Sequence, residues 1–234
     1  MPRAAVDIAQ LISASAVLGP LPEPVRARLV ATARIETFEL PTLLNAAQQP
    51  LASLRLVLKG HIDLVARSAS GLESKLTHIG PGDWVTWLGC FAAEPPLYDF
   101  YSSARASYLA LPTSLVRSVA QECTDMYPRV IQQMGKRMRL LMEWQGLSVM
   151  LAPEQRMAKL LHVMARAYGA VDGNRASLPT TQSQLANQAR CSRQVANQLL
   201  GALERRGLVR HAYSRYEIDD IERLVAFIEQ DGLD

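Results

Sequence analysis

The spacing of apolar residues changes along the 234-residue chain. From about Leu21 to Ala120, short runs of Val, Leu and Ile alternate with Gly and Pro turns, as in LRLVLKGHIDLV and the GPGD sequence at 80–83. Regular short strands of this kind predict an antiparallel sandwich or barrel. After Asp125 the apolar positions recur every three or four residues, which predicts helices.

One long helix is predicted after Asp125, with Pro128 in its first turn. Positions at alternating spacings of three and four form a narrow, mostly apolar seam, which is either a stripe facing the protein's own core or a coiled-coil-like contact with a second copy. A length of about two dozen residues between two dissimilar regions favours the dimer contact. The seam residues are Ile131, Met134, Met138, Leu141, Gln145 and Ser148.

The segment that follows predicts a second helix from Pro153, closed by Gly169 with Arg166 in its last turn. The polar sequence GAVDGNRAS is then expected to be a loop. Thr181 starts the capping-box sequence TQSQ, which predicts a short helix with Leu185 and Ala189 facing inward.

A second short helix is predicted directly after the turn at Arg190 and Cys191. Ser192 would be its N-cap and Gly207 its end, and its buried stripe is expected to be Val195, Leu199, Ala202 and Leu203. The runs LVRHAY and RYEIDD could pair as a hairpin, and a last helix is expected from about Asp220. Two short helices joined by a tight turn and followed by a hairpin predict a winged helix-turn-helix.

Charge supports a nucleic-acid partner only locally, since the whole chain carries a net charge of just +3. Residues 175–215 contain seven arginines and one acid. Arg193 suits guanine, the amides of Gln194, Asn197 and Gln198 suit adenine, and hydroxyls at helix starts suit phosphates. The alternative is a polar helix face that is merely solvated. The candidate DNA-binding residues are Thr181, Gln182, Ser192, Arg193, Gln194, Asn197, Gln198, Arg205, Arg206, Arg210 and Arg215.

Other compositional features exclude several protein classes. The apolar runs are too short to cross a bilayer and the first twenty residues lack a signal-peptide pattern, so we expect a cytoplasmic protein without a membrane partner. Cys90, Cys123 and Cys191 are too widely spaced for a disulfide framework or a four-cysteine site. A cupin-like metalloenzyme is a remote alternative, because the four histidines include no H-x-H pair.

The motif CSRQVANQLLGALERRGLV, together with LVLKGHIDLV and IGPGDWVTWLGCF, resembles the Crp/Fnr superfamily of bacterial transcription regulators. The resemblance implies an α+β protein with an N-terminal jelly-roll (double-stranded β-helix) sensor domain over residues 1–122. It further implies a dimerisation helix over 123–151 and a winged helix-turn-helix over 152–234. A homodimer on a palindromic DNA site, with RNA polymerase as a further partner, is the expected working state.

Departures from the family pattern concern the effector. Trp87 stands where cyclic-AMP-binding members have a glutamate for the ribose. Those members bind the cyclic phosphate with an arginine, and the one nearby candidate, Arg105, is expected to fall in the next strand. A buried phosphate would then lack a charged partner, so we expect no cyclic nucleotide. Oxygen-sensing members of the family bind an iron–sulfur cluster with four cysteines, three of them near the N-terminus. The first cysteine of this chain is Cys90, so the resemblance excludes such a cluster. A haem sensor using His61, His78 or Cys90 is the alternative; otherwise we expect no cofactor.

Aromatic residues near the GPGD turn could form a pocket for an apolar or aromatic small molecule, or could simply fill the core. The candidate pocket residues are Trp84, Trp87, Cys90, Phe91, Tyr98, Phe100 and Tyr101.

Overall fold

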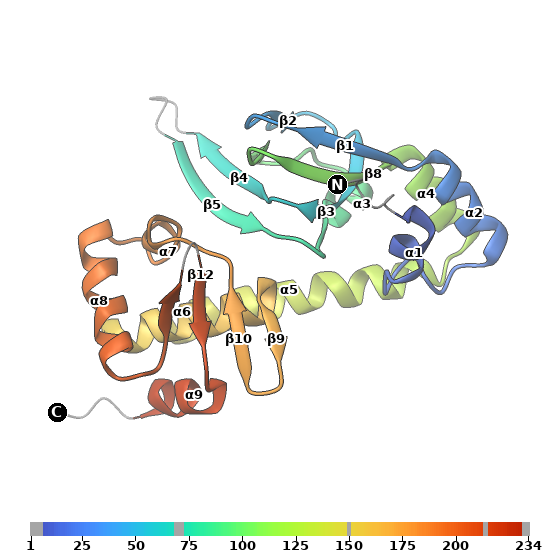
Figure 1. Ribbon diagram of the computed structural model, residues 1–234. Helices are drawn as coiled ribbons and strands as arrows, with labels where there is room; N and C mark the ends of the chain where they lie inside the picture. The colour runs from blue at the N-terminus through green and yellow to red at the C-terminus, as the bar shows by residue number, and fades with distance from the viewer. Residues whose placement is uncertain (1–6, 68–72, 149–150, 213–214, 231–234) are drawn as a thin grey trace, which may run out of the picture. The chain divides into compact units, whose positions relative to one another are not determined.

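The computed structural model describes residues 7–67, 73–148, 151–212 and 215–230, and these form two compact units (Figure 1). One unit comprises Met1–Glu73 and His78–Gly135, and the other comprises Ser74–Thr77 and Lys136–Asp234. The long helix α5 (Met126–Ser148) contributes residues to both units. This helix confirms the long helix predicted after Asp125, with Pro128 in its first turn.

The N-terminal unit is built on eight strands: β1 (Arg34–Phe38), β2 (Leu43–Asn45), β3 (Ser53–Lys59), β4 (Ile62–Arg67), β5 (Glu73–Ile79), β6 (Trp84–Val85), β7 (Asp99–Ser102) and β8 (Ala106–Pro112). They form two four-stranded sheets with the orders β1-β8-β3-β6 and β2-β7-β4-β5. A core that includes Val57, Ile62, Phe100 and Tyr108 joins strands from both sheets. This arrangement is the predicted antiparallel sandwich.

Helices cover the other face of the β3–β8 pair. They are α1 (Ile8–Ser13), α2 (Glu23–Thr32), α3 (Trp87–Phe91) and α4 (Thr113–Glu122). Their apolar residues pack with Leu54 and Leu109 of the sheet and with Met126 at the start of α5. The strands predicted over residues 21–120 were therefore wrong at α2, α3 and α4, because short apolar runs do not distinguish a strand from a buried helix.

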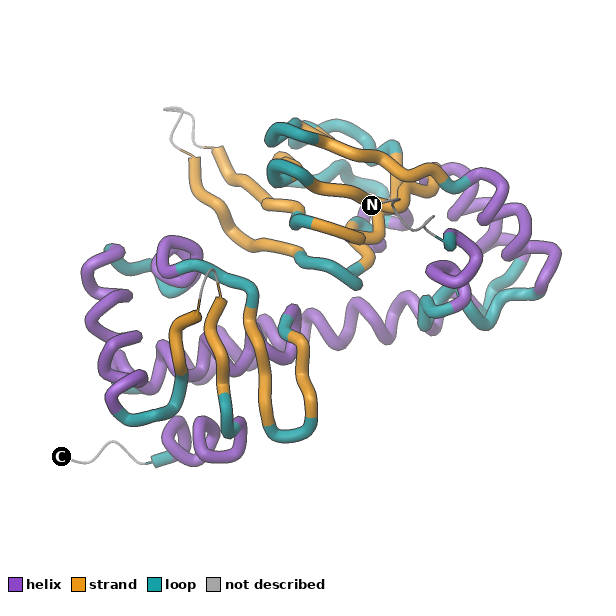
Figure 2. The backbone as a smooth tube through the Cα atoms, in the orientation of Figure 1, coloured by secondary structure: helices purple, strands orange, loops and turns teal. Residues whose placement is uncertain are grey.

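The C-terminal unit contains α6 (Pro153–Tyr168), β9 (Ala170–Asp172), β10 (Arg175–Leu178), α7 (Gln182–Gln188), α8 (Arg193–Arg205), β11 (Arg210–Ala212), β12 (Arg215–Ile218) and α9 (Ile221–Glu229). Its strands lie side by side in the order β11-β12-β10-β9, with α6 packed against them (Figure 2). The predicted end of α6 at Gly169 and the start of α9 after Asp220 are confirmed.

The β9–β10 hairpin was missed by the sequence analysis, which expected a loop there. Its two-residue turn is Gly173-Asn174, and Gly173 has a φ of +56°. This dipeptide is a strong hairpin signal, since its glycine adopts the left-handed backbone that tight turns need. On β10, Ala176 and Leu178 alternate into the core of the unit.

A buried lysine ties the C-terminal half of α5 to α6. The ammonium of Lys159, with only 7% of its side chain exposed, pairs with the carboxylate of Glu143. Arg166 binds the same carboxylate at 3.1 Å. Burial opposes ionisation of Glu143, but the Lys159 hydrogen bond and charge, with help from Arg166, hold its pKa below the ordinary value.

His162 lies beside this ion pair on α6. Burial lowers the pKa of His162, and the positive charges of Lys159 and Arg166 lower it further. Its Nδ1 atom is buried without a hydrogen bond in the part of the chain that the structure describes. The imidazole is therefore mostly neutral at pH 7, and the carboxylate of Glu143 pairs with two cations, Lys159 and Arg166.

Candidate nucleic-acid interface

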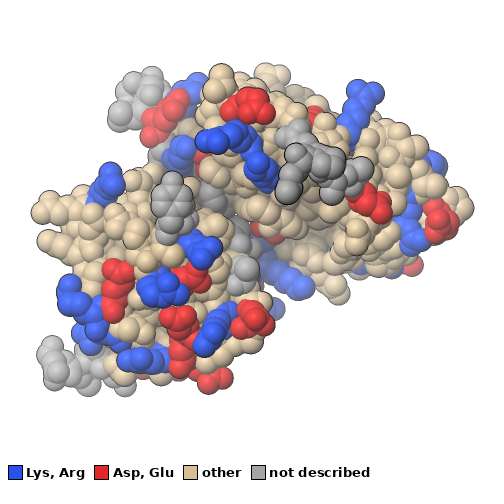
Figure 3. Space-filling view, in the orientation of Figure 1, with Lys and Arg blue, Asp and Glu red and all other residues tan. Residues whose placement is uncertain are grey.

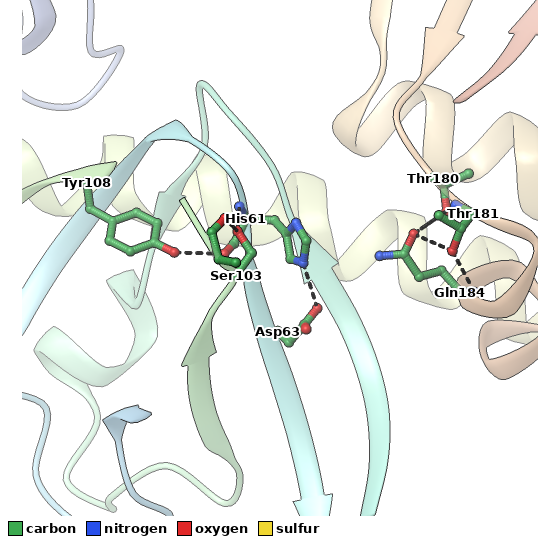
Figure 4. Close-up of polar contacts among 8 residues, drawn as sticks. His61, Asp63, Ser103, Tyr108, Thr180, Thr181 and Gln184 are labelled. Atoms are coloured by element: carbon green, nitrogen blue, oxygen red, sulfur yellow. Dashed lines mark hydrogen bonds and ion pairs between the residues drawn. The ribbon is translucent and has the colours of Figure 1, made fainter. Parts of the chain in front are cut away.

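The start of α7 is fixed by a reciprocal cap. The Thr181 backbone N–H donates to Oε1 of Gln184 at 2.8 Å, and the Gln184 backbone N–H donates to Oγ1 of Thr181 at 3.3 Å (Figure 4). The Thr181 hydroxyl also donates to Gln184 Oε1 at 3.0 Å. The capping box predicted from TQSQ is confirmed, and it engages the hydroxyl that the sequence analysis assigned to phosphate.

The turn between α7 and α8 holds an arginine in the left-handed region. Arg190 has a φ of +52°, and the following Cys191 N–H donates to the Ala186 carbonyl at 3.0 Å. A residue with a Cβ is strained there, whereas glycine is not. The turn thus stores a backbone strain that the rest of the helix pair holds in place.

Replacing this arginine by glycine is expected to stabilise the protein. Arg190→Gly should raise the free energy of unfolding by about 1 kcal/mol, because relief of strain exceeds the added freedom of the unfolded chain. Arg190→Ala keeps a Cβ and serves as the control, with a change near zero. Urea unfolding measures both, and equal stabilities of the two variants would contradict the strain argument.

Helix α8 buries a different stripe from the one predicted. Ala196, Leu200 and Leu203 are buried, Leu199 is partly buried, and Val195 is 41% exposed. The expected burial of Val195 was therefore wrong, whereas Ala202 and Leu203 are buried as expected. Spacings of three and four fit both stripes, and the small Ala196 side chain lets the helix pack closely on the core.

The exposed face of α8 follows from this stripe. An α-helix has 3.6 residues per turn, so the side of α8 opposite the buried stripe carries Gln194, Gln198, Gly201 and Arg205. Because Gly201 has no side chain, the Arg205 guanidinium lies along this face, with Nη1 only 3.5 Å from where a Cβ of residue 201 would be. Arg193 and Asn197 are exposed beside it, and Ser192 caps the helix by accepting from the Val195 N–H at 3.2 Å.

Three of the candidate phosphate-binding arginines are engaged within the protein. Arg206 binds Glu154 at 3.1 Å and lies over the Phe227 ring. Arg210 lies 3.8 Å from Asp219, and Arg215 pairs with Glu217. Basic and acidic side chains accordingly intermingle on the visible face of the part labelled β12 and α9 in Figure 1 (Figure 3).

The hairpin β11–β12 is attached to the end of α8. Oε1 of Glu204 accepts from the His211 backbone N–H at 2.6 Å, and the His211 ring contacts that of Tyr216 at a centroid distance of 4.9 Å. Gly207 has a φ of +67°, which confirms the predicted helix end. Gln182 begins α7 and is partly exposed. The β11–β12 hairpin, which is the wing, is thus connected to the helix pair α7 and α8 through the end of α8.

The aromatic residues proposed as a pocket lie in separate places in the N-terminal unit. Trp84, Trp87, Cys90 and Phe91 pack in the helix-covered core, whereas Phe100 lies in the core between the sheets. Tyr101 accepts a hydrogen bond from Arg67 at 3.2 Å, and Tyr98 is exposed. The structure does not bring these seven residues together.

Residues considered for a cyclic nucleotide or haem are also dispersed. Arg105 is exposed in the turn before β8 with a φ of +50°, and Trp87 is buried. Burial raises the pKa of the Cys90 thiol to about 12, so it remains protonated at pH 7.

Histidines provide no metal cluster in the described chain. The ring Nε2 of His61 lies 3.6 Å from Asp63 (Figure 4). The backbone N–H of His61 donates to the Ser103 hydroxyl, and its backbone carbonyl accepts from the Tyr108 hydroxyl. The side chain of His78 is outside the described residues. Among the residues described, no group of three or more His, Cys, Asp or Glu side chains could hold a metal ion.

The predicted seam of α5 is largely uncovered. Ile131, Met138 and Leu141 are exposed, and so is Gln145, whereas Met134 packs on the core of the N-terminal unit. The Ser148 side chain is outside the described residues. Met142, missed by the sequence analysis, is also exposed and follows Met138 one turn later. None of the described helices is both long and apolar enough to cross a membrane.

Comparisons with known proteins agree with this geometry. The model of the Crp-like helix-turn-helix domain matches residues 155–227. FixK2 from Bradyrhizobium japonicum is structurally similar, with a TM-score of 0.69 and 13% identity, covering 83% of this chain and 96% of its own. The c-di-GMP-responsive regulator CLP from Xanthomonas campestris has a TM-score of 0.61 and 17% identity, covering 84% and 99%.

A CRP-family transcriptional regulator from Thermus thermophilus has a TM-score of 0.58 and 19% identity, covering 82% of this chain and 95% of its own. No curated protein matches the sequence. The region that the domain model matches contains the capped α7, the turn at Arg190, α8 and the wing. Residues 155–227 therefore match a Crp-like helix-turn-helix domain, and the chain shares its fold with these solved structures.

Proposed function

We propose that this protein is a homodimeric transcription regulator that binds double-stranded DNA through α8. The observation that carries the proposal is the exposed face of α8, where Arg193, Gln194, Asn197 and Gln198 stand in the first two turns. Residues at this end of a recognition helix reach base edges in the major groove. Their guanidinium and amide groups are the ones that pair with guanine and adenine.

The exposed residues of α5 support the proposed dimer. Ile131, Gly135, Met138 and Met142 recur at spacings of four, three and four, and the three side chains are exposed. Gly135 has nothing within 4 Å of where a Cβ would be. An uncovered apolar stripe of this length on a 23-residue helix suits a matching helix of a second copy.

The N-terminal unit is the proposed sensor, and its signal is not a cyclic nucleotide. Val57 packs in the core between the two sheets, and Arg55, two residues earlier on β3, lies on the same face of the strand. The guanidinium of Arg55 is buried and is already bound to Glu36 at 2.8 Å. A cyclic phosphate would need an available cation, because an uncompensated buried charge is costly. An apolar or aromatic small molecule, or no ligand at all, remains the proposed input. The effector would act by changing the population of the orientation that binds DNA.

Selection from random duplex DNA with the purified full-length protein tests the function. We expect enrichment of a two-fold symmetric site whose half-sites lie about 10 base pairs apart, because a dimer presents two α8 helices. Affinity should fall steeply with salt, with a log–log slope steeper than about −4. Met138→Glu, which places charges in the stripe, should shift the selected sequence to a single half-site.

Failure to enrich any sequence would contradict DNA reading by α8. Enrichment of one unsymmetric half-site by the unaltered protein, together with a monomer mass, would contradict the dimer alone.

A further inference from the structure

We propose that Val195 reads thymine, by contact of its methyl groups with the C5-methyl group of the base; this inference rests on the proposed function of α8. Val195 is 41% exposed although the neighbouring Ala196 is fully buried. It stands in the first turn of α8, among the residues proposed to reach base edges.

An apolar group at this position contrasts with its surroundings. On the helix surface its neighbours Gln194 and Gln198 are polar and exposed, whereas Leu199, one turn later, is partly buried. Over residues 151–230, as far as they are described, the exposed large hydrophobic residues are Val171 on β9 and Val195. Valine is also a poorer helix former than a straight-chain polar residue, so helix propensity does not explain a valine here.

The side chain is well suited to a methyl contact. A β-branched residue in a helix is largely restricted to one χ1 rotamer, so the two methyl groups of Val195 are held in place before DNA binds. The Val195 N–H is bonded to the Ser192 cap, which fixes the backbone of this turn. Thymine is the base that presents an apolar group in the major groove.

The specificity of α8 is then divided between two kinds of contact. Amide and guanidinium groups would select purines by hydrogen bonds, while Val195 would select thymine by burial of a methyl group. The carboxamide of Gln194 and the methyl groups of Val195 are adjacent in the sequence and project about 100° apart on the helix, so they suit different base pairs.

Deoxyuridine scanning tests this inference. Each thymine of the selected site is replaced in turn by deoxyuridine, which keeps the base-pairing groups and lacks only the methyl group. For the unaltered protein, we expect one position per half-site where the replacement weakens binding about threefold to fivefold. For Val195→Ala, binding to thymine should already be weakened to a similar extent, and deoxyuridine at that position should cause no further loss.

Val171→Ala is the matched control, because it truncates another exposed valine of the same unit and should leave every deoxyuridine effect unchanged. The inference is overturned if all deoxyuridine effects persist in Val195→Ala, even when the protein binds its selected site tightly. If the unaltered protein shows no preference over random DNA, the proposed function of α8 fails as well.

Discussion

Arg193→Ala should weaken binding to the selected DNA site about 5- to 150-fold, a loss of about 1–3 kcal/mol. Arg193 is the first residue of α8 and is exposed, with no acid within ion-pair distance among the described residues. It is free to make the bidentate contact with guanine that carries sequence information. Competition binding on the selected site and on a guanine-substituted site measures both the loss and the relaxed preference.

Two variants separate base reading from charge. Arg193→Lys keeps the charge but loses the planar fork, so most of the specificity should disappear with it. Arg210→Ala, on the wing, should weaken selected and random DNA by the same small factor, since Asp219 already compensates part of its charge. Equal losses on both DNAs for Arg193→Ala would mean that this arginine contacts phosphate only.

Glu143→Ala should reduce the free energy of unfolding by about 3 kcal/mol, because it leaves the buried Lys159 ammonium without its carboxylate. We expect the lower end of the range for buried pairs, since the Glu143 side chain retains 24% exposure. The double variant Glu143→Leu/Lys159→Met removes both charges and should stay within about 1 kcal/mol of the unaltered protein. Urea unfolding at one protein concentration measures these differences.

The same pair gives a pH dependence of defined sign. The pKa of Glu143 is below its ordinary value of 4.5 in the folded protein, so its contribution is complete at neutral pH and is lost as the pH falls through the folded-state pKa. His162, also with a lowered pKa, binds a proton more readily when unfolded, and it therefore adds to the loss on acidification. A single-variant cost below about 1 kcal/mol, or stability that rises toward pH 5, would contradict this account.

Strongly periodic segments and capping sequences were predictable from the sequence. The long α5, the cap at Thr181, the N-cap at Ser192 and the left-handed Gly207 all follow from local rules that tertiary packing did not override. The N-terminal sandwich followed from the even spacing of its turns.

The errors arose where two patterns fit the same residues. On α8, both Val195 and Ala196 begin stripes with helical spacing, and contact with the core selected the smaller residue. In the N-terminal unit, the proximity of aromatic residues in the sequence suggested one pocket, but alternation along β7 and the burial of α3 send them to different cores. Ion pairs such as Arg206 with Glu154 join residues 52 apart in the sequence and could not be read locally.

The two glycines of α5 have a consequence for how the proposed dimer would assemble. Gly135 and Gly146 are open on the helix surface, and each lowers the intrinsic helix stability by about 1 kcal/mol relative to alanine. At Gly135 the missing side chain also lets a second backbone approach closely between Ile131 and Met138. Helix formation and association would then be one coupled equilibrium, in which the partner subunit acts as the ligand that completes folding of α5.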